Sequence, residues 1–169
     1  MDDLRLRPAT AADAAAICEI YNQGIVDRIA TLETEVRTPE ERREWLALRK
    51  PRHPVIVAVS AATGGTPTVL GCASLNPFNP RRAYDAVVDL SVYVERSWRG
   101  RGIGRRLLGR LVELARELGY HKMVLATFPL NLLGVALYER MGFRQVGVYR
   151  EQGELDGTWV DVLVMERLL

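Results

Sequence analysis

The sequence predicts an α/β (α+β) fold, with a mixed, partly antiparallel central sheet flanked by helices. A strand pattern is followed by two helical segments and a block of three strands, after which helix and strand alternate. Two β-branched runs, 55–59 and 69–75, flank a segment with Gly64-Gly65 and predict a hairpin. The 169 residues, 48% of them hydrophobic, fit a single domain spanning 1–169 with one proper core.

The first part of the chain predicts a strand and a helix. Residues 4–7 alternate apolar and charged side chains, the pattern of a half-buried strand. Thr10 and Asp13 then stand in capping-box spacing before an alanine-rich stretch. A helix is therefore expected to about Asn22, followed by a loop over residues 24–37.

A second helix begins with a strong start signal. Thr38 can cap it, Pro39 suits its first turn, and Glu41 can reach back to a free N–H group. It is expected to end near Lys50. The later elements follow from β-branched runs, turn residues and one amphipathic stripe. They are strands at 55–59, 69–75, 87–94 and 123–128, a loop at 76–82, helices at 102–118 and 132–141, and a closing hairpin of 146–149 and 159–165 around Asp156-Gly157.

The most informative segment is the loop rich in glycine and arginine that precedes the helix at 102–118. Such a junction aims several backbone N–H groups, and the positive end of a helix dipole, at one point where a phosphate is stabilised. Glycine lets a ligand approach the main chain closely, and arginine adds charge-assisted hydrogen bonds. The residues expected to hold the phosphates are Arg99, Gly100, Arg101, Gly102, Ile103, Gly104 and Arg105.

Other nucleotide-binding motifs do not fit this loop. A P-loop would end in Gly-Lys-Ser/Thr, and the dinucleotide fingerprint would have a third glycine where Arg105 stands. Taken alone, the segment is also compatible with an ordinary turn followed by a solvated arginine face. Nucleic acid is not the expected ligand, because the net charge is only +2 and no aromatic platform accompanies the basic residues.

Composition predicts a cytoplasmic protein without a metal or a membrane partner. Cys18 and Cys72 lie among apolar residues and lack metal-ligand spacing, so buried thiols in a reducing compartment are expected. No run approaches the roughly 18 apolar residues of a membrane span. The acidic start, Met1-Asp2-Asp3, is unlike a signal peptide.

The glycine loop resembles the acetyl-CoA signature of the GNAT superfamily of N-acetyltransferases, Gln/Arg-x-x-Gly-x-Gly/Ala between a strand and a long helix. A second segment resembles the superfamily's Asn…Ala-x-x-Leu-Tyr-Glu-x-x-Gly-Phe element, in the expected order and at the expected distance. Its matching residues are Asn131, Ala136, Leu137, Tyr138, Glu139, Gly142 and Phe143. The resemblance implies a GNAT-type fold and acetyl transfer from acetyl-CoA to an amine.

Over nearly its whole length the chain resembles the phosphinothricin N-acetyltransferase branch, which acetylates the α-amino group of glutamate-like compounds. These include phosphinothricin, arsinothricin and methionine sulfoximine or sulfone. The resemblance implies a small amino-acid substrate and a homodimer formed through the closing strands. Trp159 is expected to be a packing residue, with a position at the dimer contact as the alternative. The resemblance rests on residues 6–10, 31–35, 83–85, 91–94 and 157–161, and residues 28–38 and 149–169 look closest to arsinothricin-type members.

Amine acetylation has three chemical requirements. A base must remove the amine proton, and Asp89 is the candidate, directly or through water, where the branch commonly has Glu. The resemblance assigns a main-chain N–H of Val92-Tyr93-Val94 to the oxyanion, Tyr138 to protonation of the thiolate, and Asn131 to the pantetheine arm. The residues alone also allow Asp89 to be an ordinary polar contact and Tyr138 a core aromatic, and some phosphinothricin enzymes have His in place of this tyrosine.

An acidic amino-acid substrate also needs cationic partners, and arginine pairs with such groups bidentately. The loop before the strand at 87–94 matches the branch's substrate loop, and Arg81 is the better aligned of its two arginines. A solvent-exposed basic loop is the alternative. The residues expected around the substrate are Arg81, Arg82, Tyr84 and Phe78, with Thr31 and Glu33 on the opposite wall.

Two other functions remain open from the sequence. A protein Nα- or lysine acetyltransferase would use the same chemistry, but a peptide substrate presents no free α-carboxylate to the arginine loop. A non-catalytic acyl-CoA-binding module would keep the loop at 99–104 and would need neither Asp89 nor Tyr138. Turnover as opposed to binding separates the two classes.

Overall fold

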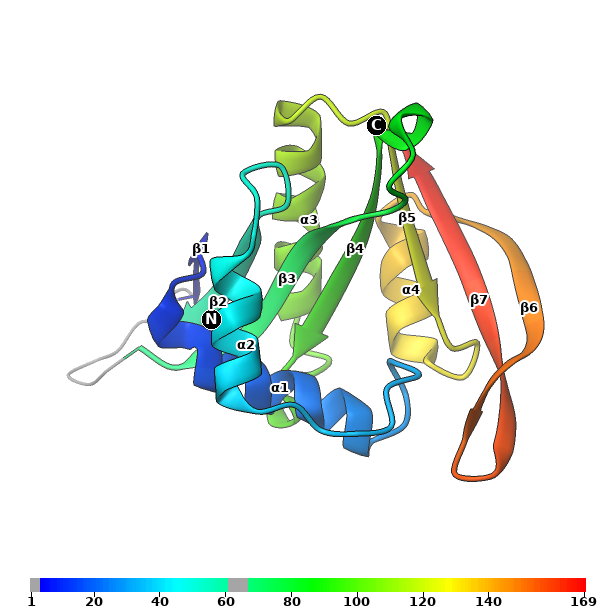
Figure 1. The fold of residues 1–169 in the computed structure, drawn as a ribbon, viewed down its shortest axis with the longest axis horizontal. Helices are drawn as coiled ribbons and strands as arrows, with labels where there is room; N and C mark the ends of the chain where they lie inside the picture. Colours follow the sequence, from blue (N-terminus) through cyan, green and yellow to red (C-terminus); the bar gives the residue numbers. More distant parts are fainter. Residues whose placement is uncertain (1–3, 61–66) are drawn as a thin grey trace.

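The computed structural model describes residues 4–60 and 67–169 and contains one central sheet with helices on both faces (Figure 1). The strands are β1 (Leu4–Pro8), β2 (Val55–Ser60), β3 (Val69–Pro77), β4 (Val87–Val94), β5 (Lys122–Thr127), β6 (Arg144–Leu155) and β7 (Thr158–Leu168). The helices are α1 (Ala14–Val26), α2 (Pro39–Ala47), α3 (Ile103–Glu117) and α4 (Leu132–Arg140). No helix of the described residues is long and apolar enough to span a bilayer.

The seven strands follow the order β1-β2-β3-β4-β5-β7-β6. Neighbouring strands are antiparallel except for β4 and β5. The predicted mixed, partly antiparallel sheet flanked by helices is therefore confirmed. Most predicted elements agree with the observed bounds to within three residues, and the exceptions have identifiable causes.

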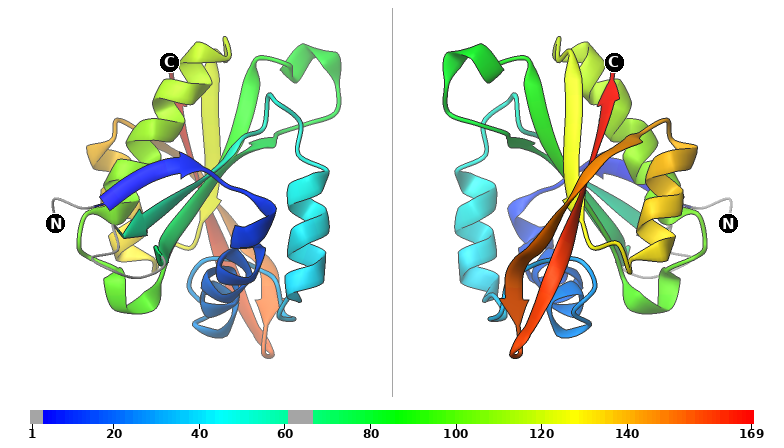
Figure 2. Two further views of the ribbon diagram at one scale, coloured as in Figure 1. Left: turned by 90° about the vertical axis from the view of Figure 1, so that its left-hand side faces the viewer. Right: turned by 90° about the vertical axis from the view of Figure 1, so that its right-hand side faces the viewer.

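Two apolar layers hold the helices on the sheet, with α1 and α2 on one face and α3 and α4 on the other (Figure 2). The larger layer contains the predicted stripe of α3, in which Leu107, Leu108 and Leu111 are each 0% exposed. Full burial of one such side chain stabilises the fold by about 1.5–3 kcal/mol. The smaller layer packs α1 against β2 and β3 and includes the buried thiol of Cys72.

The start of α2 follows its local signals. The Thr38 hydroxyl accepts from the N–H of Glu41 at 3.2 Å, and the Glu41 carboxylate accepts from the N–H of Thr38 at 2.6 Å. This is the predicted capping box. The helix ends at Ala47, three residues before the predicted end near Lys50.

The predicted end of α1 near Asn22 was wrong, because the helix continues to Val26. Gly24 ordinarily weakens a helix. Here it lies against the ring of Tyr93, and a Cβ at this position would stand 3.4 Å from that ring. Tertiary packing therefore outweighs local propensity over the last turn of α1.

The predicted hairpin of β2 and β3 is present as an antiparallel pair, and its Gly64-Gly65 turn lies outside the described residues. The loop expected at 76–82 begins later than predicted, because β3 continues to Pro77. Asn76 pairs with Asp89 in the β3–β4 ladder, so an asparagine that looks like a loop residue in the sequence belongs to the sheet.

Strand β6 is much longer than the predicted 146–149. It is an edge strand and is exposed along almost its entire length, so the alternation of buried and exposed residues that reveals a strand is missing. The turn at Asp156-Gly157 is where the sequence placed it, and both residues have positive φ, +51° and +78°.

The sheet splits between its two parallel strands. Residues Val87–Asp89 of β4 pair with Lys122–Val124 of β5, and no pairs follow. Beyond this point the strands diverge, with α4 beside the opening (Figure 1). Residues 90–94 of β4 therefore have main-chain groups on one side that no strand satisfies, which makes the split a place for a ligand.

Candidate active site

The glycine loop leads from the end of β4 into α3. Gly100 and Gly102 have φ of +74° and +82°, a left-handed conformation that glycine adopts without strain. The first bond of the helix runs from the N–H of Arg106 to the carbonyl of Gly102 at 3.2 Å. Among the described residues, the N–H groups of residues 100–105 have no protein acceptor. Together with the helix dipole they form a strong site for an anion.

The side chains of this loop divide into two groups. Arg99 Nη1 lies 2.7 Å from Asp27 Oδ2, and its Nε donates to the carbonyl of Val94 at 3.2 Å, so this arginine fastens the loop to the end of α1. Arg101 stacks on Trp98 at 4.8 Å and is exposed. Arg105 is also exposed, in the first turn of α3. The two exposed arginines are the cations available to a bound anion.

Asp89 is a half-buried carboxylate on the third residue of β4. Asn76 Nδ2 donates to its Oδ2 at 3.3 Å and to Ser91 Oγ at 3.1 Å. Within the described chain, no cation forms a salt bridge with Asp89, and burial raises its pKa to about 6 despite the bond from Asn76. A carboxylate of this pKa suits proton transfer near neutral pH.

Tyr138 lies in the last turn of α4 and is 8% exposed. Its ring packs edge-on against Phe143 with 5.9 Å between centroids. Burial raises its pKa to about 12, and the negative charge of Asp89 contributes, so the two groups are in electrostatic reach of each other. The hydroxyl is therefore a proton donor at physiological pH, and it bonds to none of the described residues.

The segment Val92-Tyr93-Val94 lies at the open side of the split. The two valines pack into the layer under α3 and α4, whereas the Tyr93 ring meets Tyr21 of α1 at 5.0 Å. Their side chains are core residues, so only the main chain can act on a ligand.

Asn131 caps α4 near the end of β5. Its Oδ1 accepts from the N–H of Gly134 at 3.1 Å, and its Nδ2 donates to Thr127 Oγ1 at 3.2 Å.

The loop between β3 and β4 carries the aromatic and basic residues that the sequence proposed for the substrate. Phe78 and Tyr84 are part-exposed, and their rings lie edge to face at 5.4 Å. The side chains of Arg81 and Arg82 are exposed and bond to no described residue. Since the loop connects Asn76 to the strand of Asp89, it is anchored beside the carboxylate.

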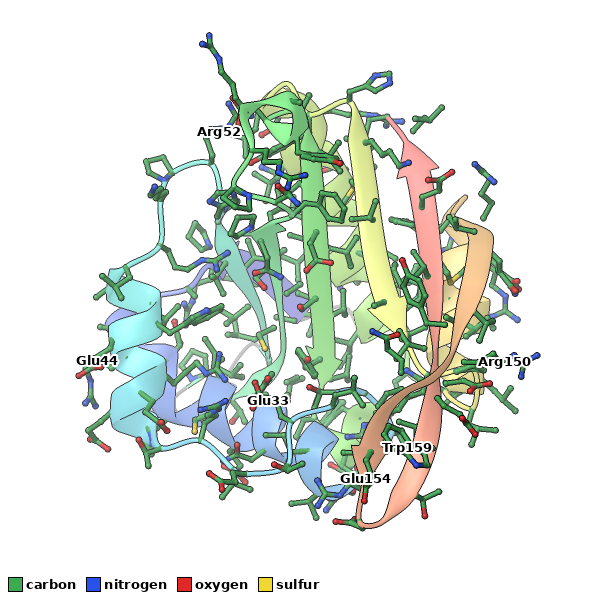
Figure 3. All side chains as sticks on the ribbon, turned by 45° about the vertical axis from the view of Figure 1, so that its right-hand side comes forward. Glu33, Glu44, Arg52, Arg150, Glu154 and Trp159 are labelled. Atoms are coloured by element: carbon green, nitrogen blue, oxygen red, sulfur yellow. The ribbon has the colours of Figure 1, made fainter. Side chains whose placement is uncertain are left out.

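Thr31 and Glu33 lie in the connection between α1 and α2. The Glu33 carboxylate is paired with Arg37. The main-chain N–H of Glu33 donates to Thr31 Oγ1 at 3.2 Å. Arg52 donates to the carbonyl of Asp85 at 3.0 Å, so its position in Figure 3 shows where the loop between β3 and β4 lies. In the same view Glu33 lies toward the other end of the sheet. The structure therefore does not bring these two residues next to Arg81.

A cavity of about 220 Å³ lies between α1, α2 and the adjoining face of β3 and β4. Its polar lining residues are Arg42, Ser74, Asn76 and Ser91. Asn76 links the cavity to Asp89. Arg42 was not among the site residues predicted from the sequence. The spacing of Arg42, Trp45 and Arg49 is the signal that could have found it, because it places two arginines and a tryptophan on one side of α2 and the turn that follows.

The fold and the site define a class of protein: an enzyme with an anion-binding helix terminus at a split sheet and a carboxylate of raised pKa beside a small polar cavity. The model of the acetyltransferase (GNAT) family matches residues 17–143. The chain therefore belongs to this family and is an N-acetyltransferase.

Known relatives match along almost the whole chain. The phosphinothricin N-acetyltransferase of Streptomyces coelicolor is 33% identical over 167 residues, which are 99% of this chain and 97% of the relative. The L-methionine sulfoximine/L-methionine sulfone acetyltransferase of Pseudomonas aeruginosa is 33% identical over 95% of this chain and 92% of its own. The crystal structure of a phosphinothricin acetyltransferase from Sinorhizobium meliloti in complex with AcCoA has a TM-score of 0.90 at 31% identity, covering 99% of this chain and 89% of that one.

Proposed function

We propose that this enzyme uses acetyl-CoA to acetylate the α-amino group of a glutamate-like amino acid or a toxic analogue of one. Phosphinothricin, arsinothricin and methionine sulfoximine or sulfone are the candidates. The observation that carries the proposal is the Asp89 carboxylate, with its pKa of about 6, between a small polar cavity and the split of the sheet. The names of the relatives support the same substrate class.

The residues around the split fit acetyl-CoA, which supplies the acetyl thioester. The N–H groups of residues 100–105 would receive its pyrophosphate, and Arg101 and Arg105 would add charge. The pantetheine arm would run between β4 and β5 and pass Asn131. Arg99 contributes by holding the loop to Asp27.

Three groups of the chain would carry the chemistry. Asp89 accepts a proton from the substrate ammonium, directly or through a water, and leaves a neutral amine that attacks the thioester carbon. A main-chain N–H of residues 92–94 donates to the carbonyl oxygen as negative charge develops there. Tyr138 donates its proton to the sulfur as the carbon–sulfur bond breaks. The attacking nitrogen gives up its second proton, which restores the Tyr138 hydroxyl directly or through a water, and the products are an N-acetyl amino acid and a thiol.

The loop between β3 and β4 would hold the α-carboxylate of the substrate next to the amine. Arg81, or its neighbour Arg82, provides a bidentate cation there. Tyr84 and Phe78 would pack against the carbon chain. Thr31 and Glu33 remain candidates for the opposite wall.

The proposal is tested by thiol release from acetyl-CoA against a panel of amines. The panel contains phosphinothricin, arsinothricin, methionine sulfoximine, methionine sulfone, glutamate, a lysine peptide and a polyamine. Turnover confined to the amino acids supports the proposal. Turnover of the peptide alone would replace it with a protein acetyltransferase, and tight acetyl-CoA binding without turnover of any amine would favour a binding module.

A further inference from the structure

One buried cation of the cavity, Arg42, has no anionic partner among the described residues. Arg42 is only 9% exposed. Its Nε is the one buried side-chain nitrogen or oxygen without a hydrogen bond among the described residues. Its guanidinium forms no salt bridge with any described carboxylate. A buried charge without an anion is costly, so such a group is expected where a ligand supplies the anion.

The surroundings hold the guanidinium in place without using its hydrogens. It stacks over the ring of Tyr21 at 4.3 Å and over that of Trp45 at 4.7 Å, as measured to the ring centroids. Stacking engages the faces of the guanidinium and leaves the N–H groups at its edge for an acceptor. Glu41, next in the chain, is already bound to the N–H of Thr38 and lies 3.7 Å from Arg37.

The second arginine beside this cavity differs from the first. Arg49 stacks on Trp45 at 4.7 Å, and it donates to the carbonyl of His53 at 2.9 Å and to Asn76 Oδ1 at 3.2 Å. Its N–H groups are therefore used to support the framework. Arg42 is the cation of the pair that remains for a ligand.

We propose that Arg42 binds the acidic group at the end of the substrate side chain, a carboxylate or phosphinate, while the amine lies near Asp89. The inference rests on the proposed function. With this role, Arg42 selects amino acids whose side chain ends in a negative charge over amino acids whose side chain has the same length and no charge.

The strand register supports this assignment over the α-carboxylate. On the cavity face, Asp89 stands two residues from Ser91 and four from Tyr93, about 13 Å along the strand. Arg42 belongs to the far end, because it stacks on Tyr21, which packs on Tyr93. A glutamate-like side chain puts its acidic group about 5 Å from the amine, whereas the α-carboxylate is adjacent to it. The acidic group of such a side chain therefore reaches further from Asp89 toward the Arg42 end of the cavity than the α-carboxylate does.

The experiment compares two substrates of one shape. Phosphinothricin ends in an anionic methylphosphinate and methionine sulfone in a neutral methylsulfonyl group, on the same carbon chain. Arg42→Gln is expected to lower kcat/KM for phosphinothricin by about thirtyfold, mainly through KM, and to change that for methionine sulfone by less than about threefold. Arg43→Gln, an exposed neighbour in α2, is the matched control and should alter neither value.

The ratio of the two kcat/KM values does not depend on how much protein is folded, so a destabilised variant still gives an answer. Arg42→Lys keeps the charge without the planar fork and should give an intermediate ratio. An equal loss with both substrates, or an unchanged ratio, would overturn the assignment of Arg42.

Calorimetry separates this inference from the proposed function. Phosphinothricin is titrated into wild type and Arg42→Gln, each saturated with CoA, which cannot react. Binding to wild type that weakens about thirtyfold in the variant supports Arg42 even if no amino acid of the panel is turned over. Equal binding to both proteins, or no binding to either, contradicts it.

Discussion

Asp89 is the proposed base, and burial in the fold brings its pKa close to neutral pH. Its pKa of about 6 predicts that kcat/KM rises with pH through that value, because only the carboxylate accepts a proton. Asp89→Asn should lower kcat/KM at pH 7.5 by about a hundredfold and remove this limb of the profile. The pH dependence of thiol release from acetyl-CoA measures both. A limb near pH 6 that persists in the variant would point to another base.

The same burial predicts a cost in stability. Raising the pKa from 3.8 to about 6 corresponds to about 2.4 kcal/mol lost as the pH rises from 4 to 7, since the unfolded state ionises first and the folded state resists ionisation. Asp89→Asn should therefore be more stable to urea than wild type at pH 7, by about 2 kcal/mol, and about equally stable at pH 4. A variant that is less stable at pH 7 would show that the carboxylate is a structural group.

Tyr138 combines a packing role with a proposed chemical one, and substitution can separate them. Phe keeps the ring against Phe143 but removes the proton. Tyr138→Phe should lower kcat by at least about tenfold and leave the Kd for acetyl-CoA nearly unchanged, as expected for an interaction made in the transition state. Steady-state kinetics and calorimetry provide the two values, and an unaltered kcat would remove Tyr138 from the mechanism.

At the scale of elements, the start of α3 is the feature on which cofactor binding is expected to depend. Gly102 has a φ of +82°, which a β-branched residue adopts only with strain, so Gly102→Val should displace the N–H groups that precede the helix. Calorimetry should detect no acetyl-CoA binding to this variant. Gly109→Ala, in the middle of the same helix, is the control: its new Cβ would meet only Met141, at 3.8 Å, and should stabilise the helix by about 1 kcal/mol without changing affinity.

For the whole molecule, the exposed edge of the sheet predicts association. Val148 and Tyr149 of β6 and Trp159 of β7 are 41%, 58% and 59% exposed, although large apolar side chains usually lie inside. We propose that a second copy of the chain covers them in a homodimer. Light scattering should give twice the mass of one chain, and Trp159→Glu should shift the protein to monomer with its fold intact. Leu48→Glu, at an exposed position just after α2, is the control.

The candidate site was predictable where it depends on residues close together in the chain. The loop from Arg99 to Gly104 carries its own glycines, and its phosphate-binding geometry needs only the strand before it and the helix after it. The positions of Asp89 and Tyr138 came from family resemblance. Their electrostatic contact, and the raised pKa of the carboxylate, came only from the structure, because burial depends on what packs above a strand.

By itself, the sequence determined the helix starts, the amphipathic stripe of α3, the glycine loop and the order of the elements, since these depend on local hydrogen bonds and on periodicity. Tertiary structure alone decided three features: the last turn of α1, the split between β4 and β5, and the cavity in which Arg42 pairs with no carboxylate of the described residues. Each depends on contacts between segments far apart in the chain. Local propensity does not encode such contacts, and packing energy outweighs propensity where the two compete.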